Sequence, residues 1–282
     1  MINALKYIGI LCLFCFSFFY TNKAVTVVRE VDPIMVKIRE EVENYNKDSI
    51  DALIKGNEII PGVNGCVIDI NNSYKNMKRI NTYNPNFLKF KEVPPSVSIL
   101  GNYDKYIVSG NGKNREVSLI VNMLDKENVE LILHIIKSKE LNVNFFVDGN
   151  FIEKNLVYIN DMKEGNEIYN SGYDGLYDRA GLLWTNSLIE SFSYNKSMYC
   201  LNSKKNDDIL KLCSRSKMYT IMPSFVINNN NFIQNISNIS NGSIIYIDNR
   251  NINAINNTIN YLKKRGFKFV VLSDLLSEKG CI

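Results

Sequence analysis

Three acidic side chains near expected strand ends are the residues of this sequence best suited to acid–base chemistry. Asp174 and Asp248 are expected near the mouth of one site, with Glu167 in the strand between them. Paired carboxylates can serve as general acid and base on a glycosidic bond, or bind a hard divalent cation through oxygen. Carboxylates at strand ends more commonly cap loops through hydrogen bonds to the backbone. The sequence alone leaves both roles open.

The sequence does not indicate a zinc site or a nucleophilic catalytic triad. The chain has one histidine, His134, in an apolar helical stretch that offers nothing to complete a metal site. A catalytic triad around Ser171 is not expected, because this histidine lies on a different element of the expected fold. We expect His134 to be structural.

The six cysteines do not form a metal-binding pattern. Cys12 and Cys15 have the spacing of a redox motif, but they lie in an apolar segment where that chemistry is not expected. The other four are isolated, and disulfides among them are allowed outside the cell, although a chain of this size does not need them. These four are Cys66, Cys200, Cys213 and Cys281.

The composition is that of a globular protein. Its 282 residues, 45% of them hydrophobic, suffice for one large domain and a smaller one. The 33 Lys and Arg against 29 Asp and Glu give a net charge of +4, and the basic residues are scattered. Nucleic acid is therefore not an expected partner. The heavy use of Asn, Lys and Ile is typical of an AT-rich bacterial genome.

The amino terminus has the layout of a signal sequence or signal anchor. Residues 7–20 are uncharged and almost entirely apolar, and they lie between Lys6 and Lys23. The bulky residues 18–20 do not suit a cleavage site, so an uncleaved anchor is favoured over a cleaved signal or a buried helix. We expect residues 1–23 to cross the cell membrane once, with the main body outside the cytoplasm.

Two short regions are expected between this anchor and the main body. Residues 24–50 are expected to form a stalk helix, with Asp32 as its cap and Pro33 at its first position. Residues 51–112 are expected to form a small membrane-proximal module of short strands and turns, which carries no catalytic signature.

From residue 113 to residue 282, apolar runs alternate with amphipathic stretches. Strands that alternate with helices of this length predict right-handed βαβ units and a parallel sheet. About seven strands favour an α/β fold with a distorted (β/α) barrel, whose functional groups, Asn202 among them, lie at the carboxyl ends of the strands. The expected strands span 117–121, 143–147, 166–170, 198–201, 219–227, 243–247 and 267–272, and the expected helices span 128–141, 150–165, 182–192, 206–214 and 251–264.

Four segments of this region carry a family resemblance. In order they span residues 143–150, 165–175, 242–248 and 262–275. The second reads Gly-Asn-Glu-Ile-Tyr-Asn from Gly165, where the family pattern reads Gly-His-Glu-Ile-x-Asn-His. Together the four resemble the polysaccharide deacetylase family, whose domain is also called NodB-like. The resemblance implies hydrolysis of the acetamide of N-acetylated sugars by a divalent metal, an aspartate base and a histidine acid.

The groups that this chemistry requires are missing from the matching positions. The resemblance places Asn122 at the base and Met123 at the metal-binding aspartate. It places Ser171 and Gly175 at the two histidine ligands, and Asp248 at the acid histidine. A neutral amide cannot take the proton, and a thioether is too soft for a hard divalent ion. We therefore expect a pseudoenzyme without metal, cofactor or catalytic residues.

Polar and aromatic side chains near the expected mouth form a candidate glycan site. Aromatic faces stack on sugars, while amides and carboxylates form hydrogen bonds to hydroxyl groups. The same aromatics suit a second role, which is to fill the space left by metal and histidines. The candidates are Asn122, Asn170, Tyr173, Asp174, Trp184 and Asp248.

The expected function is that of a membrane-anchored, extracytoplasmic protein that resembles a deacetylase and binds cell-wall glycan or an envelope protein. One alternative is a divergent carbohydrate deacetylase or hydrolase that acts on C–N bonds of N-acetylated cell-wall polysaccharide. A second alternative is a protein-binding scaffold whose contact surface lies on residues 51–111.

Overall fold

The computed structural model describes residues 11–18, 20, 26–193 and 197–281. Residues 11–18 are helical, with exposed apolar side chains such as Leu13 and Phe14. Of the expected anchor, residues 1–10, 19 and 21–23 lie outside the described residues, as do residues 24 and 25 of the expected stalk. Within the described ranges no helix is long and apolar enough to cross a membrane. The anchor is therefore not shown and stays a prediction.

The chain divides into two compact units, at other places than the sequence predicts. Residues 51–63 and 95–112, expected in a separate module, belong to the same unit as the barrel region because they supply strands to its sheet. Unit 1 comprises residues 1–49, 64–94 and 280–282, and unit 2 comprises residues 50–63 and 95–279.

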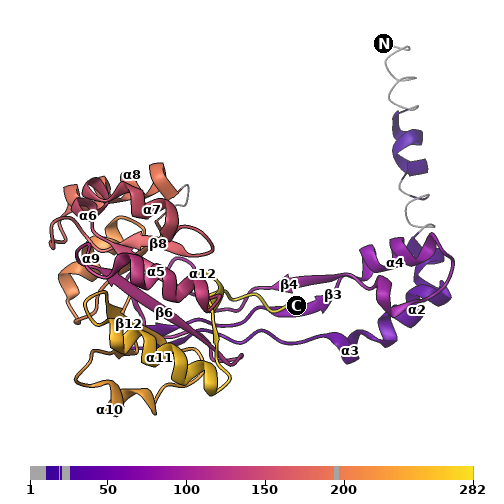
Figure 1. The fold of residues 1–282 in the computed structure, drawn as a ribbon. Helices are drawn as coiled ribbons and strands as arrows, with labels where there is room; N and C mark the ends of the chain where they lie inside the picture. Colours follow the sequence, from indigo (N-terminus) through magenta and orange to yellow (C-terminus); the bar gives the residue numbers. More distant parts are fainter. Residues whose placement is uncertain (1–10, 19, 21–25, 194–196, 282) are drawn as a thin grey trace, which may run out of the picture. The chain divides into compact units, whose positions relative to one another are not determined.

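Unit 1 is built from short helices and one antiparallel strand pair (Figure 1). Asp32 caps its first helix by accepting a hydrogen bond from the backbone N–H of Ile34, with Pro33 at the first position as expected. A disulfide joins Cys66 to Cys281 in this unit. Its elements are α2 (Pro33–Glu40), α3 (Val42–Tyr45), β3 (Gly65–Ile68), α4 (Ile70–Lys78), η1 (Pro85–Phe87) and β4 (Phe90–Val93).

Unit 2 contains one curled, mostly parallel sheet that forms a half-barrel, which is consistent with the expected α/β fold with a distorted (β/α) barrel. Across its described residues the sheet has eleven strands, and only β1 runs antiparallel to its neighbour. An isolated antiparallel bridge between Ser109 and Ser243 links the chain after β5 to the chain before β12. In sheet order the strands are β1 (Leu53–Lys55), β2 (Glu58–Ile60), β5 (Tyr106–Ile107), β10 (Tyr219–Ile221), β9 (Tyr199–Leu201), β8 (Glu167–Asn170), β7 (Asn144–Val147), β6 (Glu116–Met123), β12 (Ile244–Asp248) and β11 (Phe225–Val226), with β13 (Lys268–Phe269) beside β6.

The helices and strands of unit 2 follow the expected pattern except at the three places described next, and the short helix α10 (Phe232–Ile236) is additional to those expected. The expected helix 150–165 is two helices that meet at Asn155. The expected strand 219–227 is β10 and β11, interrupted around Pro223, which has no N–H for a strand ladder. The last expected strand is short because a helix begins at Leu272. The helices are α5 (Val129–Ser138), α6 (Gly149–Lys154), α7 (Leu156–Met162), α8 (Arg179–Ser193), α9 (Asp207–Arg215), α10 (Phe232–Ile236), α11 (Ile252–Lys264) and α12 (Leu272–Leu275).

The two faces of the sheet carry separate hydrophobic cores. Alternate residues of β6 show the division, because Val121 and Met123 face the helices while Ile120 faces the other side. We call the helix side the outer core and the opposite side the inner core. The inner core contains Tyr169 and Tyr199, whose rings meet edge to face with centroids 4.9 Å apart. The interior of the curled sheet is thus filled by its own side chains.

Burial of these tyrosines makes the fold sensitive to alkaline pH. Burial raises the pKa of Tyr169 and of Tyr199, with the Glu167 carboxylate adding to both shifts. Burial and a hydrogen bond to Asp207 raise the pKa of Tyr106 to about 12. A phenol whose pKa is higher in the folded state contributes stability that is fully present below the unfolded value of about 10. That stability is lost as the pH rises through the folded-state pKa.

We expect the melting temperature to fall as the pH rises from about 10 to about 12. Tyrosinate absorbance should appear in two steps, with exposed tyrosines ionising first and buried ones only on unfolding. Tyr106→Phe should make the free energy of unfolding less dependent on pH, whereas Tyr45→Phe, at an exposed position, should not. Ionisation of all 16 tyrosines in one step in the folded protein would contradict this account.

Candidate functional site

A cavity of about 750 Å³ lies at the carboxyl ends of β6, β7, β8 and β9. This volume falls within the usual range of small-ligand pockets, and the position is the one expected for functional groups in such a sheet. The cavity is lined by Asn122, Leu124, Asp125, Lys126, Asp148, Asn150, Phe151, Lys154, Asn155, Ser171, Asp174, Gly175, Tyr177, Leu201, Asn202, Ser203, Lys204, Asn206 and Ile209.

The cavity brings together three of the five positions that the resemblance marks as degenerate. Asn122, Ser171 and Gly175 all line it. Met123 instead lies fully buried in the outer core, on the helix side of the sheet. Asp248 lies at the end of β12, beside Asn122 in the strand pairing, and is used in a loop described below.

The side chains at these positions do not suit a divalent metal. They supply one amide, one hydroxyl and, at Gly175, no side chain. Zinc and similar divalent metal ions in proteins are held mainly by carboxylate, imidazole or thiolate ligands. Throughout the described ranges no group of three or more His, Cys, Asp or Glu side chains is arranged to hold a metal ion.

Two buried amide oxygens at the cavity have no hydrogen-bond partner among the described residues. Asn122, 6% exposed, donates from Nδ2 to the hydroxyl of Tyr246 at 3.2 Å, while its Oδ1 stays unpaired. Asn202, 1% exposed, donates from Nδ2 to the carbonyl of Asn206 at 2.8 Å, and its Oδ1 is also unpaired. An unpaired buried acceptor costs about 1–3 kcal/mol. Both oxygens are therefore suited to accept a hydrogen bond from a ligand.

Burial of the Tyr246 hydroxyl affects its ionisation. Burial raises the pKa of Tyr246, and the hydrogen bond from Asn122 opposes this rise. The phenol therefore stays neutral at physiological pH, so the partner of the Asn122 amide is an uncharged hydroxyl.

Gly175, which the resemblance places at a histidine ligand, lies in a tight backbone turn. Tyr173 and Leu176 exchange backbone hydrogen bonds of 2.9 and 3.0 Å. Asp174 and Gly175 between them have φ values of 51° and 73°. Positive φ at both central residues is typical of a type I′ turn, for which Asp-Gly is a favoured sequence. A histidine at position 175 would be strained by this backbone whatever space surrounded it.

Two side chains after β7 hold this turn in place. Asp148 caps α6 through the backbone N–H of Phe151 at 3.1 Å, and its other oxygen accepts from the N–H of Gly175 at 2.7 Å. Asn150 donates from Nδ2 to Asp174 Oδ1 at 2.8 Å. The turn is thereby fixed against the start of α6 and forms one wall of the cavity.

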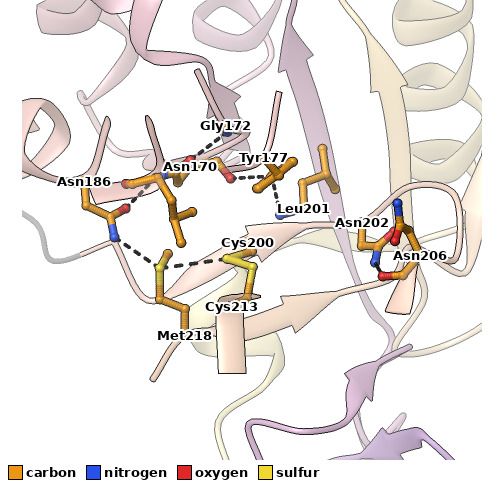
Figure 2. Close-up of a disulfide and its surroundings, with 11 residues drawn as sticks. Asn170, Gly172, Tyr177, Asn186, Cys200, Leu201, Asn202, Asn206, Cys213 and Met218 are labelled. Atoms are coloured by element: carbon orange, nitrogen blue, oxygen red, sulfur yellow. Dashed lines mark hydrogen bonds between the residues drawn. A yellow bond between two sulfur atoms is a disulfide. The ribbon is translucent and has the colours of Figure 1, made fainter. Parts of the chain in front are cut away.

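Asn170, one of the expected glycan candidates, is fully engaged within the protein. Its Nδ2 donates to Asn186 Oδ1 at 2.7 Å, and its Oδ1 accepts from the N–H of Gly172 at 2.7 Å (Figure 2). The backbone carbonyl of Asn170 accepts from the hydroxyl of Tyr177, and this hydroxyl also accepts from the N–H of Leu201. This network ties the ends of β8 and β9 together, so Asn170 positions the cavity wall.

Tyr173 and Trp184, the aromatic candidates, lie beside the cavity and share one carboxylate. Glu153 accepts from the Tyr173 hydroxyl at 2.9 Å and from the Trp184 indole N–H at 2.6 Å. Trp184 is 52% exposed, so the ring presents a face to solvent while its N–H is held. We call Tyr173, Trp184 and Glu153 the aromatic platform.

The three carboxylates expected around one mouth do not come together. Asp248 caps the loop before α11 by accepting from the N–H of Arg250 at 3.1 Å and from Asn251 at 2.9 Å. Glu167 lies at the amino end of β8, opposite the cavity, and accepts from Tyr169 and from the N–H of Ser273. Of the three, Asp174 alone lines the cavity, so these three carboxylates do not form a paired acid and base there.

A disulfide closes the segment that supplies another wall of the cavity. Cys200 in β9 is joined to Cys213 in α9, and both are fully buried (Figure 2). The lining residues between 201 and 209 all fall within this loop. The sequence did not indicate which cysteines pair. It also did not single out the three lysines that line the cavity, because exposed lysines scattered along a sequence are common. These are Lys126, Lys154 and Lys204.

Comparison with known proteins identifies the fold. No family model matches the chain. The chain is 29% identical over 175 residues to the uncharacterized protein YlxY of Bacillus subtilis (strain 168). That match covers 61% of this chain and 52% of YlxY, so it spans about half the length of that relative.

Solved structures give a broader match. The CE4 family pseudoenzyme BA3943 from Bacillus anthracis aligns with a TM-score of 0.64 and 25% identity, over 88% of this chain and 96% of that one. A BA3943 mutant with restored enzymatic activity aligns with the same TM-score at 24% identity. The Bc1960 peptidoglycan N-acetylglucosamine deacetylase aligns with a TM-score of 0.54 and 20% identity, over 62% of this chain and 95% of that one. The expected resemblance is confirmed: the chain has the polysaccharide deacetylase fold in a degenerate, NodB-like form.

We expect removal of the disulfide at the cavity to loosen this wall. Cys200→Ala/Cys213→Ala frees a loop with a sequence separation of 13, which should lower the free energy of unfolding by about 3 kcal/mol. Hydrogen exchange of the backbone at 201–206 should become faster. The control is Cys66→Ala/Cys281→Ala, which removes the disulfide of unit 1 and should leave exchange at 201–206 unchanged. Equal exchange in both variants would contradict a role of Cys200 and Cys213 in holding the wall.

Proposed function

We propose that this protein is a non-catalytic, deacetylase-like protein that binds cell-envelope glycan at the carboxyl ends of its strands. The observation that carries the proposal is the cavity at positions 122, 171 and 175, with the unpaired buried oxygens of Asn122 and Asn202. Sugar hydroxyl and acetamide N–H groups are hydrogen-bond donors of the kind that these oxygens lack. A partly open cavity, without a group of His, Cys, Asp or Glu side chains arranged to hold a metal among the described residues, favours binding over hydrolysis.

The aromatic platform supports the same proposal. Tyr173 and Trp184 are restrained by Glu153, so little side-chain entropy would be lost when a sugar ring stacks on them. Glu153 lies in α6 beside Lys154, which lines the cavity. Platform and cavity thus adjoin along one helix, which suits an oligosaccharide longer than one sugar.

The similar proteins favour an envelope glycan as ligand. One is named as a peptidoglycan N-acetylglucosamine deacetylase and another as a pseudoenzyme of the same family. We propose that this chain has kept a glycan cavity from that fold without the reaction. Its two disulfides are typical of proteins outside the cytoplasm. With the apolar residues 7–20, they support our proposal of a membrane-attached, extracytoplasmic protein.

A mutant of the similar pseudoenzyme BA3943 has restored enzymatic activity, so we compare what the same kind of change would require in this chain. In this chain, an aspartate at Met123 would bury a charge in the outer core. A histidine at Gly175 would occupy the strained turn described above. Recovery of a metal site here would therefore need changes of backbone as well as of side chains, which favours the non-catalytic proposal.

We expect Asn122→Ala/Asn202→Ala to weaken glycan binding. Each lost hydrogen bond is worth about 1 kcal/mol, so the dissociation constant for chitotetraose should rise roughly tenfold to thirtyfold. Calorimetry would measure it, after thermal unfolding shows that the variants fold. Asn142→Ala/Asn253→Ala removes two exposed amides outside the cavity and should bind like the native protein. Tyr173→Ala/Trp184→Ala should also reduce retention on purified peptidoglycan.

Absence of binding by the native protein to both chitotetraose and peptidoglycan would reject the glycan proposal. In that case an envelope protein would be the remaining partner class. Retained glycan binding in the Asn122→Ala/Asn202→Ala variant would place the glycan outside this cavity.

We expect no hydrolysis by the native protein. The purified protein should contain no stoichiometric zinc by elemental analysis, and it should release no acetate from chitotetraose or peptidoglycan, because no group of three or more His, Cys, Asp or Glu side chains in the described part of the chain is arranged to hold a metal. Stoichiometric zinc together with acetate release that Asn122→Ala abolishes would sink the non-catalytic proposal and establish the divergent enzyme instead.

A further inference from the structure

We propose that the cavity takes an acidic glycan, whose carboxylate or phosphate is bound by Lys126, Lys154 and Lys204. This inference rests on the proposed function, because it names the class of glycan that the same cavity holds. It goes beyond it by assigning a role to three lysines on three different elements. Lys126 follows β6, Lys154 ends α6 and Lys204 follows β9.

The three lysines have ammonium groups available for a ligand. All three are exposed and line the cavity. Within the described ranges none of them forms an ion pair or a side-chain hydrogen bond. Other lysines of unit 2 do have partners, for example Lys205 with Glu58 and Lys268 with Glu116. The cavity rim is thus a place where positive charge from separate elements gathers without compensation by ion pairs.

The aspartates of the same cavity are engaged differently. Asp125 accepts from the N–H of Glu127 at 2.8 Å and from Asn249 at 3.0 Å. Asp148 accepts from two backbone N–H groups, and Asp174 accepts from Asn150, as described above. The formal charges of three lysines and three aspartates balance, but the aspartates are already bonded to the loops that shape the cavity. Among the described residues, the three lysine ammonium groups have no such partner, so they are the positively charged groups available to an acidic ligand.

The combination of groups selects an acidic sugar among simpler ligands. A free carboxylate or phosphate ion would satisfy the lysines but would offer few donors to Asn122 and Asn202. A neutral sugar would offer those donors but would leave the lysines unused. A sugar with an acidic substituent supplies both hydroxyl donors and a negative charge.

The test compares two oligosaccharides that differ only in charge. One is a tetrasaccharide of alternating N-acetylglucosamine and N-acetylmuramic acid with free carboxylates, and the other is its methyl ester. We expect the native protein to bind the acid roughly tenfold more tightly than the ester at low ionic strength, with the difference shrinking as salt is added. A wall teichoic acid fragment with phosphodiesters serves as the second acidic probe and distinguishes phosphate from carboxylate.

The variant that tests the assignment is Lys126→Gln/Lys154→Gln/Lys204→Gln. It should lose the preference for the acid while binding the ester as the native protein does. The control Lys113→Gln/Lys137→Gln/Lys264→Gln removes the same total charge from exposed positions outside the cavity and should keep the preference.

The outcomes distinguish failure of the acidic-glycan inference from failure of the proposed function. Equal binding of acid and ester by the native protein, or an unchanged preference in the cavity variant, would overturn the acidic-glycan inference and leave glycan binding intact. Failure of the native protein to bind any of the three probes would overturn both. Tight binding of the teichoic acid fragment alone, lost in the cavity variant, would assign the acidic group as phosphate.

Discussion

Full hydrogen bonding of buried asparagine side chains is the constraint on which the ends of this sheet depend. Asn144 donates to Ser118 and to the carbonyl of Leu119, and accepts from the N–H of Leu272. Asn249 similarly accepts from the N–H of Leu124 and donates to both the side chain and the carbonyl of Asp125. A buried amide stabilises a fold only when its donors and acceptors are paired. These amides therefore fix strand to strand and loop to loop.

The same rule separates the asparagines that build the site from those suited to act in it. Asn170 is fully buried and fully bonded, so it holds β8 to α8 and has nothing left for a ligand. Asn122 and Asn202 are almost as buried, yet each keeps an unpaired oxygen where the cavity begins. Sequence alone treats all three as polar groups at strand ends. Only the partners seen in three dimensions distinguish a structural amide from one with free capacity.

The order of strands and helices in unit 2 could be predicted from sequence because hydrophobic periodicity reports which faces are buried. The interruption around Pro223 and the break at Asn155 are local events that periodicity does not resolve. The Cys200–Cys213 pairing depends on how β9 and α9 meet, which spacing does not reveal. Residues 50–63 joined the large sheet through long-range strand pairing, which a linear division of the chain cannot anticipate.

Gly175 shows why a missing ligand is more than a missing side chain. Resemblance presents it as a histidine position left empty, whereas the backbone there is a tight Asp-Gly turn held by Asp148. Asp-Gly is a turn signal that could have been read locally, independent of any family pattern. In this turn the N–H of Gly175 donates to the Asp148 carboxylate at the cavity wall. Met123 lies in the outer core, on the helix side of the sheet. The positions that the resemblance assigns to metal ligands thus contribute here to the shape of the cavity wall and to the packing of the outer core.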